Sequence, residues 1–198
     1  MSARVVVLAG PSGAGKSHLS ARLGLPLLRL DDFYREAGDP DLPMISLAGG
    51  SPIVDWDDPR SWDRSAAVEA LSELCRTGCT RVPSYDIAKS RRTDWHELHL
   101  DGAPLVVAEG IFAQEIVEAC AQHGLLAAAY CVNQPAPVTF LRRLVRDLRE
   151  HRKPPLVLIR RGLLLMRQQR AIVRHAEALG CTAVSPDRAY AEIRALEG

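Results

Sequence analysis

One short segment near the N-terminus constrains this chain more than any other. Residues 10–17 read Gly-Pro-Ser-Gly-Ala-Gly-Lys-Ser, which is a glycine, four free positions and then Gly-Lys-Ser. A backbone that curls so that its N–H groups converge on phosphate oxygens needs glycines, because they tolerate both the curl and the close approach. The segment therefore predicts a loop that binds the phosphates of a nucleotide.

The residue types within this P-loop pattern suggest separate tasks. Lys16 can reach the terminal phosphates, and Ser17 can offer its hydroxyl to Mg²⁺. A helix that starts here adds the positive end of its dipole. The predicted nucleotide site, for ATP or GTP with Mg²⁺, consists of these residues of the loop: Gly10, Ser12, Gly13, Ala14, Gly15, Lys16 and Ser17.

The flanking residues favour a genuine loop of this kind. Residues 5–9 form a short apolar run that suits a buried parallel strand. Residues 18–23 carry Leu19 and Leu23 at helical spacing. Strand, glycine loop and helix thus come in the required order, which argues against a chance match in a protein that binds no nucleotide.

Bulk properties narrow the class of protein. The 198 residues suffice for one domain, residues 1–198, with a sheet covered by helices on both faces. A net charge of +1 gives no field that would attract nucleic acid. No apolar stretch is long enough for a secretory signal or a membrane span, so we expect a cytoplasmic protein without a membrane partner. Five cysteines without a C-x-x-C pair indicate reduced, mostly buried thiols and no zinc site.

An acidic pair follows the second expected strand. Residues 25–30 read as a short strand that leads into Asp31 and Asp32. Ligands of open α/β sheets lie beyond the carboxyl ends of the strands, so this pair should face the phosphate site. One carboxylate can accept a proton from a substrate hydroxyl, while the other faces metal-bound water or solvent. The alternative is that both aspartates cap a helix.

An unusual loop follows a stretch rich in Gly, Pro, Asp and Ser. Within residues 55–63, Trp56 and Trp62 stand among four aspartates. Aromatic faces can stack on a flat ligand, and carboxylates can accept hydrogen bonds from sugar hydroxyls. We therefore place Trp56 and Asp57 in the acceptor site, and leave Trp62 open between a core anchor and a ligand contact.

The middle of the chain predicts a helix over residues 65–76, a β-hairpin and another buried strand. Alternation over residues 95–100 toward an Asp101-Gly102 turn indicates the hairpin, a plausible wall for an acceptor site. Residues 105–108 form the strand, which ends in Glu109. A carboxylate at such a strand tip can lie beside the P-loop and hold Mg²⁺.

The last third predicts a helix over residues 111–123, a strand over 125–132, a helix over 156–178 and an edge strand over 181–184. Between the second and third of these, arginines recur at helical spacing, so several guanidinium groups share one face. A solvated face or a nucleic-acid patch could explain them. Because a P-loop is present, we favour a helical lid over about residues 142–155 that neutralises transferred charge.

Several ordered motifs resemble the uridine kinase family of P-loop kinases, which is close to phosphoribulokinase and bacterial pantothenate kinases. The resemblance covers nearly the whole chain and rests on the following motifs: the P-loop, Asp31-x-Phe33-Tyr34, Asp57-x-Pro59, Tyr85-Asp86 with Arg92, Glu109-Gly110, and Arg143-x-x-Arg146-Asp147. It implies a five-stranded, mostly parallel sheet flanked by helices, with a β-hairpin and an Arg-rich lid.

The resemblance also implies roles for particular residues. Asp31 would be the general base, Arg146 would contact phosphates as a catalytic residue with Lys16, and Ser17 with Glu109 would hold Mg²⁺. The acceptor would be bound by residues that belong to these motifs or lie beside them: Asp31, Tyr34, Trp56, Asp57, Tyr85, Arg92 and Arg143. A homo-oligomer is a further implication.

Two departures bear on the acceptor. Uridine kinases usually carry an aromatic residue after Tyr-Asp and a histidine three positions later, where this chain has Ile87 and Ser90. Their lid usually reads Arg-Gly-Arg, where residues 151–153 are His-Arg-Lys. The leading prediction is ATP-dependent phosphorylation of a nucleoside, uridine or cytidine, to its 5′-monophosphate in pyrimidine salvage. Alternatives are another alcohol, such as a modified nucleoside, pantothenate or a sugar phosphate, or a nucleotide-binding regulator that transfers nothing.

Overall fold

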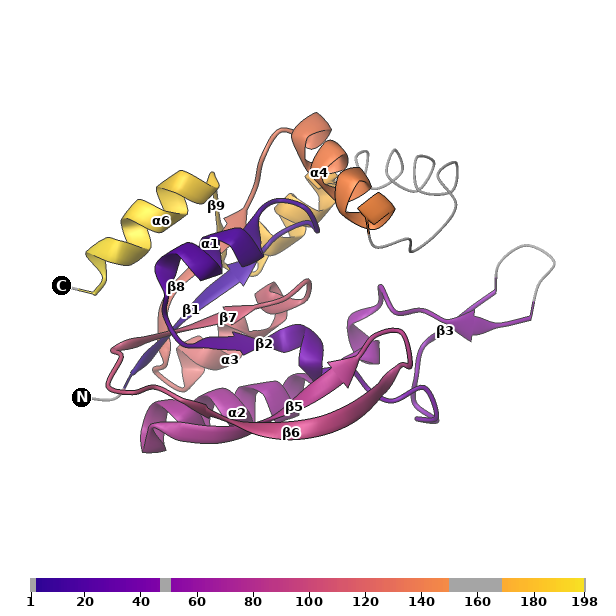
Figure 1. Ribbon diagram of the computed structural model, residues 1–198, viewed down its shortest axis with the longest axis horizontal. Coiled ribbons are helices and arrows are strands. Elements are labelled where there is room, and N and C mark those ends of the chain that lie inside the picture. Colours follow the sequence, from indigo (N-terminus) through magenta and orange to yellow (C-terminus); the bar gives the residue numbers. More distant parts are fainter. Residues whose placement is uncertain (1–2, 47–50, 150–168, 198) are drawn as a thin grey trace.

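A five-stranded parallel sheet forms the centre of the protein (Figure 1). The computed structural model describes residues 3–46, 51–149 and 169–197. The strand order is β2-β7-β1-β8-β9, so the predicted parallel sheet and its last edge strand are confirmed. The strands are β1 (Arg4–Ala9), β2 (Leu27–Arg29), β7 (Leu105–Glu109), β8 (Leu126–Val132) and β9 (Thr182–Val184).

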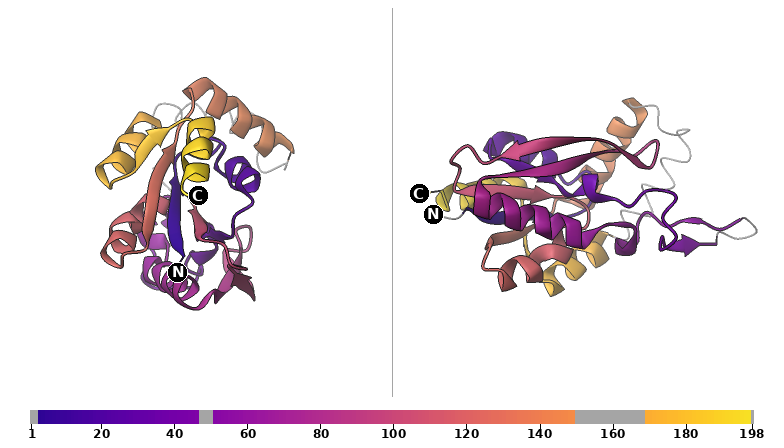
Figure 2. Two further views of the ribbon diagram at one scale, coloured as in Figure 1. Left: turned by 90° about the vertical axis from the view of Figure 1, so that its left-hand side faces the viewer. Right: turned by 90° about the horizontal axis from the view of Figure 1, so that it is seen from below.

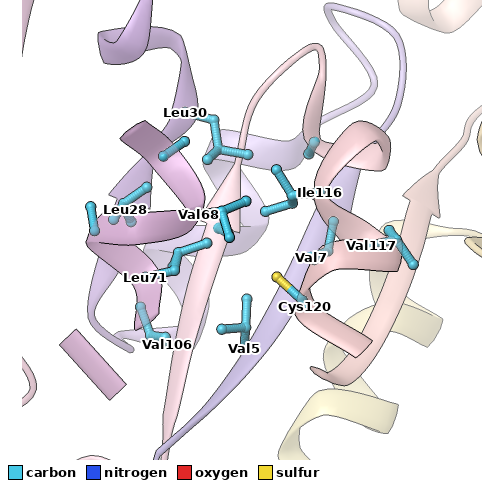
Figure 3. Packing of buried hydrophobic residues seen from close by; sticks show 14 of the residues in the cluster. Val5, Val7, Leu28, Leu30, Val68, Leu71, Val106, Ile116, Val117 and Cys120 are labelled. Atoms are coloured by element: carbon cyan, nitrogen blue, oxygen red, sulfur yellow. The ribbon is translucent and has the colours of Figure 1, made fainter. Parts of the chain in front are cut away.

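Helices cover both faces of this sheet, because successive apolar side chains of β1 point to opposite faces and both faces must be buried. Val5 and Val7 pack on one face, among helices α2 and α3 and residues 169–178, whereas Val6 and Leu8 pack on the other face against α1 and α6. Figure 3 shows the first of these two clusters. The helices are α1 (Lys16–Leu23), α2 (Arg64–Thr77), α3 (Val117–Gln122), α4 (Ala136–Arg149) and α6 (Pro186–Ala195).

The boundaries of α2 follow from its caps. Asp63 accepts a hydrogen bond from the N–H of Ala66 at the start of the helix. Gly78, with φ of 87°, ends it in the left-handed region that glycine adopts easily. The predicted helix over residues 65–76 is therefore confirmed, and the chain turns directly into the hairpin strand that follows.

A separate antiparallel hairpin, β5 (Cys79–Asp86) with β6 (Arg91–His99), packs against α2 and the segment after β2. The predicted hairpin turn at Asp101-Gly102 is wrong, because that turn joins β6 to β7. The hairpin turns at residues 87–90, where the Asp86 carboxylate accepts hydrogen bonds from the N–H groups of Ala88 (3.0 Å) and Lys89 (3.1 Å). Such an aspartate replaces the usual Asp-Gly signal.

Short elements connect these parts. They are three 3₁₀-helices, η1 (Leu30–Phe33), η2 (Pro59–Ser61) and η3 (Ala113–Ile116), and the strands β3 (Met44–Ile45) and β4 (Ile53–Val54). β3 projects from the body of the protein (Figures 1 and 2). The predicted helix over 111–123 is η3 followed by α3. No helix is predicted from the sequence where the structure has α6.

Part of the predicted lid falls outside the described residues. Residues 142–149 form the end of α4, whereas residues 150–155 and most of the predicted helix over 156–178 lie outside; residues 169–178 are helical. Within the described ranges, none of the helices has the length and apolar character required to cross a membrane. The same ranges hold no group of three or more His, Cys, Asp or Glu that could bind a metal by themselves.

Candidate functional site

The P-loop connects β1 to α1, and its backbone conformation requires glycine. The φ angles are 128° at Gly10, 87° at Gly13 and 101° at Gly15, all values that side chains disfavour. A Cβ on Gly10 would also collide with the carbonyl oxygen of Val132 at the end of β8. The loop is thus pressed against the end of β8, and this close approach permits only glycine at position 10.

Several side chains of the loop are buried or half-buried. Lys16 is 7% exposed, and its Nζ donates to the carbonyl oxygens of Gly10 (2.8 Å) and Pro11 (3.5 Å). Ser12 is half-buried and Ala14 is buried within the same loop. An ammonium group held over a ring of backbone groups is suited to a phosphate ligand.

Ser17 and Glu109 meet at the carboxyl end of the sheet. The Ser17 hydroxyl donates to Glu109 Oε1 at 3.0 Å, although 92 positions separate the two residues. The other oxygen, Oε2, lies 3.5 Å from the hydroxyl of Ser20, one helical turn further along α1. A hydroxyl and a carboxylate are oxygen ligands of the type that Mg²⁺ prefers, so this pair fits the metal that the sequence predicts.

Asp31, in η1 directly after β2, lies against the residues that follow β7. Its Oδ1 accepts a hydrogen bond from the N–H of Ile111 at 3.1 Å. A Cβ on Gly110 would stand 2.8 Å from Cβ of Leu30 and 2.9 Å from Asp31 Oδ1, so only glycine permits this approach. β2 and β7 are neighbours in the sheet, and Asp31 and Glu109 therefore flank Gly110.

The second carboxylate of the acidic pair has a different environment. Asp32 Oδ1 accepts from the N–H of Tyr85 at 3.3 Å, and Oδ2 lies 3.7 Å from Nε of Arg29. Burial raises the pKa of Asp32, while Arg29 and the hydrogen bond from Tyr85 oppose that increase. The prediction that the second carboxylate faces metal-bound water or solvent is wrong, because this one packs against the hairpin. Neither aspartate caps the 3₁₀-helix η1, since its N-cap is Arg29.

An aromatic cluster adjoins Asp31. The Tyr34 ring lies 5.8 Å from the rings of Trp56 and Tyr85 and 6.0 Å from that of Phe112, and its hydroxyl donates to the Trp56 carbonyl at 3.3 Å. Burial raises the pKa of Tyr34 well above its usual range, and the charges of Asp31 and Asp57 add to the increase. Tyr34 is therefore close to both carboxylates.

Trp62 is a core residue rather than a ligand contact. Its side chain is 3% exposed, its Nε1 donates to the carbonyl of Leu30 at 2.6 Å, and its ring lies 6.1 Å from that of Phe112. Of the two roles that the sequence leaves open for Trp62, core anchor and ligand contact, the structure shows the core anchor. Phe112, which the sequence reasoning missed, joins the core to the cluster around Tyr34; its only signal is that it follows Glu109-Gly110 closely.

The remaining predicted acceptor residues differ in placement. Asp57 is exposed, and its N–H donates to Asp55 at 3.1 Å. Arg92 pairs with Tyr85 across the hairpin, but its guanidinium lies 4.0 Å from Asp63 at the start of α2, and its buried Nε has no hydrogen-bond partner among the described residues. Arg143 and Arg146 lie on α4, and their side chains fall outside the described part of the structure.

Known proteins with similar sequences are kinases of small molecules. A uridine kinase from Deinococcus deserti is 27% identical over 199 residues, which cover 96% of this chain and 85% of the relative. A uridine kinase from Staphylococcus aureus is 26% identical over 156 residues, covering 74% of this chain and 69% of the relative. No protein-family model matches the chain.

A solved structure supports the same fold. It comes from Silicibacter sp. TM1040, from a protein with a provisional assignment as a fructose transport system kinase. The TM-score is 0.59 at 17% identity, over 87% of this chain and 85% of the other. The chain is therefore similar to uridine kinases over most of its length, and it has the fold of a P-loop kinase.

Proposed function

We propose that the protein transfers the γ-phosphoryl group of ATP to a primary hydroxyl of a small alcohol, with uridine or cytidine as the first candidate and the nucleoside 5′-monophosphate as product. The position of Asp31 carries this proposal, because its carboxylate is fixed by the N–H of Ile111, directly after the Glu109-Gly110 tip of β7. A base at that place can accept the proton of the attacking hydroxyl. A nucleotide-binding regulator would have no use for it.

On the nucleotide side, each residue has a distinct proposed role. The backbone N–H groups of the P-loop and the Lys16 ammonium would bind the phosphates, and Arg146 would contact them from α4. Ser17 and Glu109 would hold Mg²⁺, which when bound supplies positive charge against the transferred phosphoryl group. GTP is the alternative donor. Because the transition state has little covalent character for the protein to stabilise, these residues act mainly by position and charge.

The acceptor side is formed by the residues around Tyr34. Trp56 and Tyr85 would enclose the acceptor, Asp57 would accept hydrogen bonds from its hydroxyls, and Arg92 and Arg143 complete the proposed set. Tyr34 is 8% exposed, so it supports the wall of the site more than it offers surface to a ligand. Its hydroxyl donates to the Trp56 carbonyl and so holds the Trp56 loop against Tyr34.

A sugar-like alcohol is the second candidate, because the hairpin turn is used differently from that of uridine kinases. The carbonyl of Ser90 accepts from the N–H of Ala37 at 3.0 Å, and Ser90 has φ of 49°. Ile87, at the usual aromatic position, is 63% exposed. The positions that usually lie near a pyrimidine thus anchor the turn or face outward, and the related fold of a kinase linked to fructose points the same way.

The proposal extends to the protein as a whole. Residues 1–198 would form one domain whose lid covers about residues 142–155. The protein would act in the cytoplasm on a small molecule, without nucleic acid or membrane as partner, and would assemble as a homo-oligomer.

The decisive experiment measures ADP release from Mg·ATP with a panel of alcohols: uridine, cytidine, modified nucleosides, pantothenate, fructose and sugar phosphates. Asp31→Asn should bind ATP nearly as well as the wild type while turnover falls by about 10³-fold or more, since general-base catalysis contributes about 10²- to 10⁴-fold. Asp94→Asn, an exposed carboxylate on β6, is the matched control and should retain turnover.

Three results would count against the proposal. Undiminished turnover of Asp31→Asn would remove Asp31 from the role of base. ATP binding without stimulation by any member of the panel would favour the regulator. Stimulation by fructose alone would move the acceptor from the first to the second candidate.

A further inference from the structure

The second aspartate of the acidic pair, Asp32, connects two parts of the proposed acceptor site. Its side chain is 14% exposed, and its Oδ1 accepts a hydrogen bond from the N–H of Tyr85 on β5. Asp31, the adjacent residue, points instead to Ile111 at the end of β7. The Asp31 carboxylate therefore connects η1 to the end of the central sheet, and the Asp32 carboxylate connects η1 to the hairpin.

Two further hydrogen bonds connect the same segments. The Tyr85 hydroxyl donates to the carbonyl of Arg35 at 2.9 Å, and the N–H of Ala37 donates to the carbonyl of Ser90 at 3.0 Å. The hairpin tip is thus attached to the chain after Asp31 at three points. Of these three, only the contact made by Asp32 uses a side chain of the acidic pair itself.

Asp32 binds the hairpin where its ladder is irregular. The register shifts between Ser84 and Tyr85, so that Tyr85 pairs with Arg92 and leaves Thr93 as an extra residue. A bulge of this kind bends the strand and re-aims the side chains beyond it. Because Tyr85 is the first residue after the shift, its amide is the place where an outside acceptor can fix the direction of the hairpin tip.

We propose that Asp32 is a positioning residue, which holds the hairpin wall of the acceptor site at a fixed distance from Asp31. The inference rests on the proposed transfer reaction, because it assigns Tyr85 to the acceptor. Asp32 acts through the Tyr85 backbone and touches no reacting atom. Its removal should therefore disturb acceptor binding and alignment and leave the nucleotide side unchanged.

The surroundings of Asp32 support a role beyond stability. The charged and titratable groups that face it are Arg29, Asp31 and His96, and burial dominates over them in raising its pKa. Since the folded-state pKa is raised, the ionised form costs stability as the pH rises through that value. Asp32→Asn removes this charge and keeps an oxygen for the Tyr85 N–H, so it separates the hydrogen bond from the charge.

The test compares Asp32→Ala and Asp32→Asn with Glu97→Ala, a control on the exposed face of β6. For Asp32→Ala we expect an acceptor KM raised about tenfold and a kcat lowered about tenfold, with the KM for ATP within twofold of wild type. Asp32→Asn should recover most of the acceptor KM. Loss of folded protein alone would lower the apparent kcat without moving the acceptor KM. An unchanged acceptor KM in Asp32→Ala, or equal impairment in Asp32→Asn, would overturn the proposal.

A second readout separates this proposal from the proposed function. Hydrogen exchange of the peptide that contains Tyr85 should be faster in Asp32→Ala than in the wild type and near wild type in Asp32→Asn. If no alcohol accepts phosphate from the wild type, the proposed function fails, and this exchange still decides whether Asp32 fixes the hairpin. Equal exchange in Asp32→Ala and the wild type would refute it. If Asp32→Ala does not fold, Asp32→Leu, which keeps volume without an acceptor oxygen, takes its place.

Discussion

On the proposed phosphate side of the candidate site, backbone groups form most of the surface, whereas on the proposed acceptor side the walls are side chains. Three glycines with φ from 87° to 128° curl residues 10–15 against the end of β8. The acceptor side draws instead on η1, the loop before η2 and strand β5, which contribute Asp31, Trp56 and Tyr85. The first side is contiguous in sequence, and the second is assembled by folding.

This difference predicts how each side responds to change. A backbone cradle fits phosphate of any nucleotide and fails as a whole when a glycine is replaced. A wall of separate side chains can lose one member and keep partial binding, so its substitutions should be graded. The following changes test that contrast.

The largest effect is expected at the junction of the two sides. Gly110→Ala would place a Cβ 2.8 Å from Cβ of Leu30 and 2.9 Å from Asp31 Oδ1, so η1, which carries the proposed base, must shift. Because a displacement of about 1 Å can cost about 10² in rate, kcat should fall by that factor or more while ATP still binds. Steady-state kinetics and ATP titration would measure both.

Gly38→Ala is the matched control for this change, since a Cβ there meets nothing within 4 Å. It should retain wild-type turnover. If Gly110→Ala lost ATP binding and turnover together, the two sides would be less separable than the geometry indicates.

A smaller effect is expected at the proposed metal ligands. Glu109→Gln removes the charge beside Ser17 but keeps an oxygen for its hydroxyl. The Mg²⁺ concentration for half-maximal activity should rise by about 10- to 100-fold, the range typical of weakened metal sites. Glu118→Gln, an exposed glutamate on α3, serves as control, and an identical Mg²⁺ dependence in both variants would exclude Glu109 as a ligand.

The acceptor wall should respond more mildly. Trp56→Ala removes the ring that packs on Tyr34 but keeps the carbonyl that accepts from the Tyr34 hydroxyl. We expect the acceptor KM to rise about tenfold, since an aromatic pair contributes about 0.5–1.5 kcal/mol. The KM for ATP should not change. Trp95→Ala, an exposed tryptophan beside Arg81 on the hairpin, is the control. A raised KM for ATP in Trp56→Ala would break the separation of the two sides.

The smallest functional effect is expected at the cysteines. Cys79 is exposed, whereas burial raises the pKa of Cys75, Cys120 and Cys131 to about 11 and that of Cys181 to about 12. Only thiolates react readily, so one thiol per native chain should be modified quickly at pH 8. Cys79→Ser should remove that fast phase without altering kinase activity. A fast phase that persisted would show that a core thiol becomes accessible.

The contrast between the two sides also explains which parts of the structure could be predicted. The P-loop, the flanking strand and the tips that carry Asp31 and Glu109 follow from local patterns, because glycine spacing and short apolar runs determine them directly. The parallel sheet follows from the same runs. Roles that depend on a residue's chemistry at a strand tip, such as those of Asp31, remain predictions.

Other features depend on contacts that no local pattern reveals. The Asp101-Gly102 pair is a strong turn signal, but the turn of the hairpin is stabilised by the Asp86 side chain. Trp56 and Trp62 look alike in sequence, and only the bond from Trp62 to Leu30 places the latter in the core. Asp32 could not be assigned because its partner lies 53 positions away.

The hairpin turn has one more consequence, which concerns protein engineering. Asp86 closes residues 87–90 at one end through its carboxylate, and Ser90 anchors the other end to Ala37. The side chains of Ile87 and Ala88 are exposed between these two fixed points. The turn is therefore held at both ends, and substitutions limited to these two positions should leave the hairpin, Asp31 and the P-loop where they are.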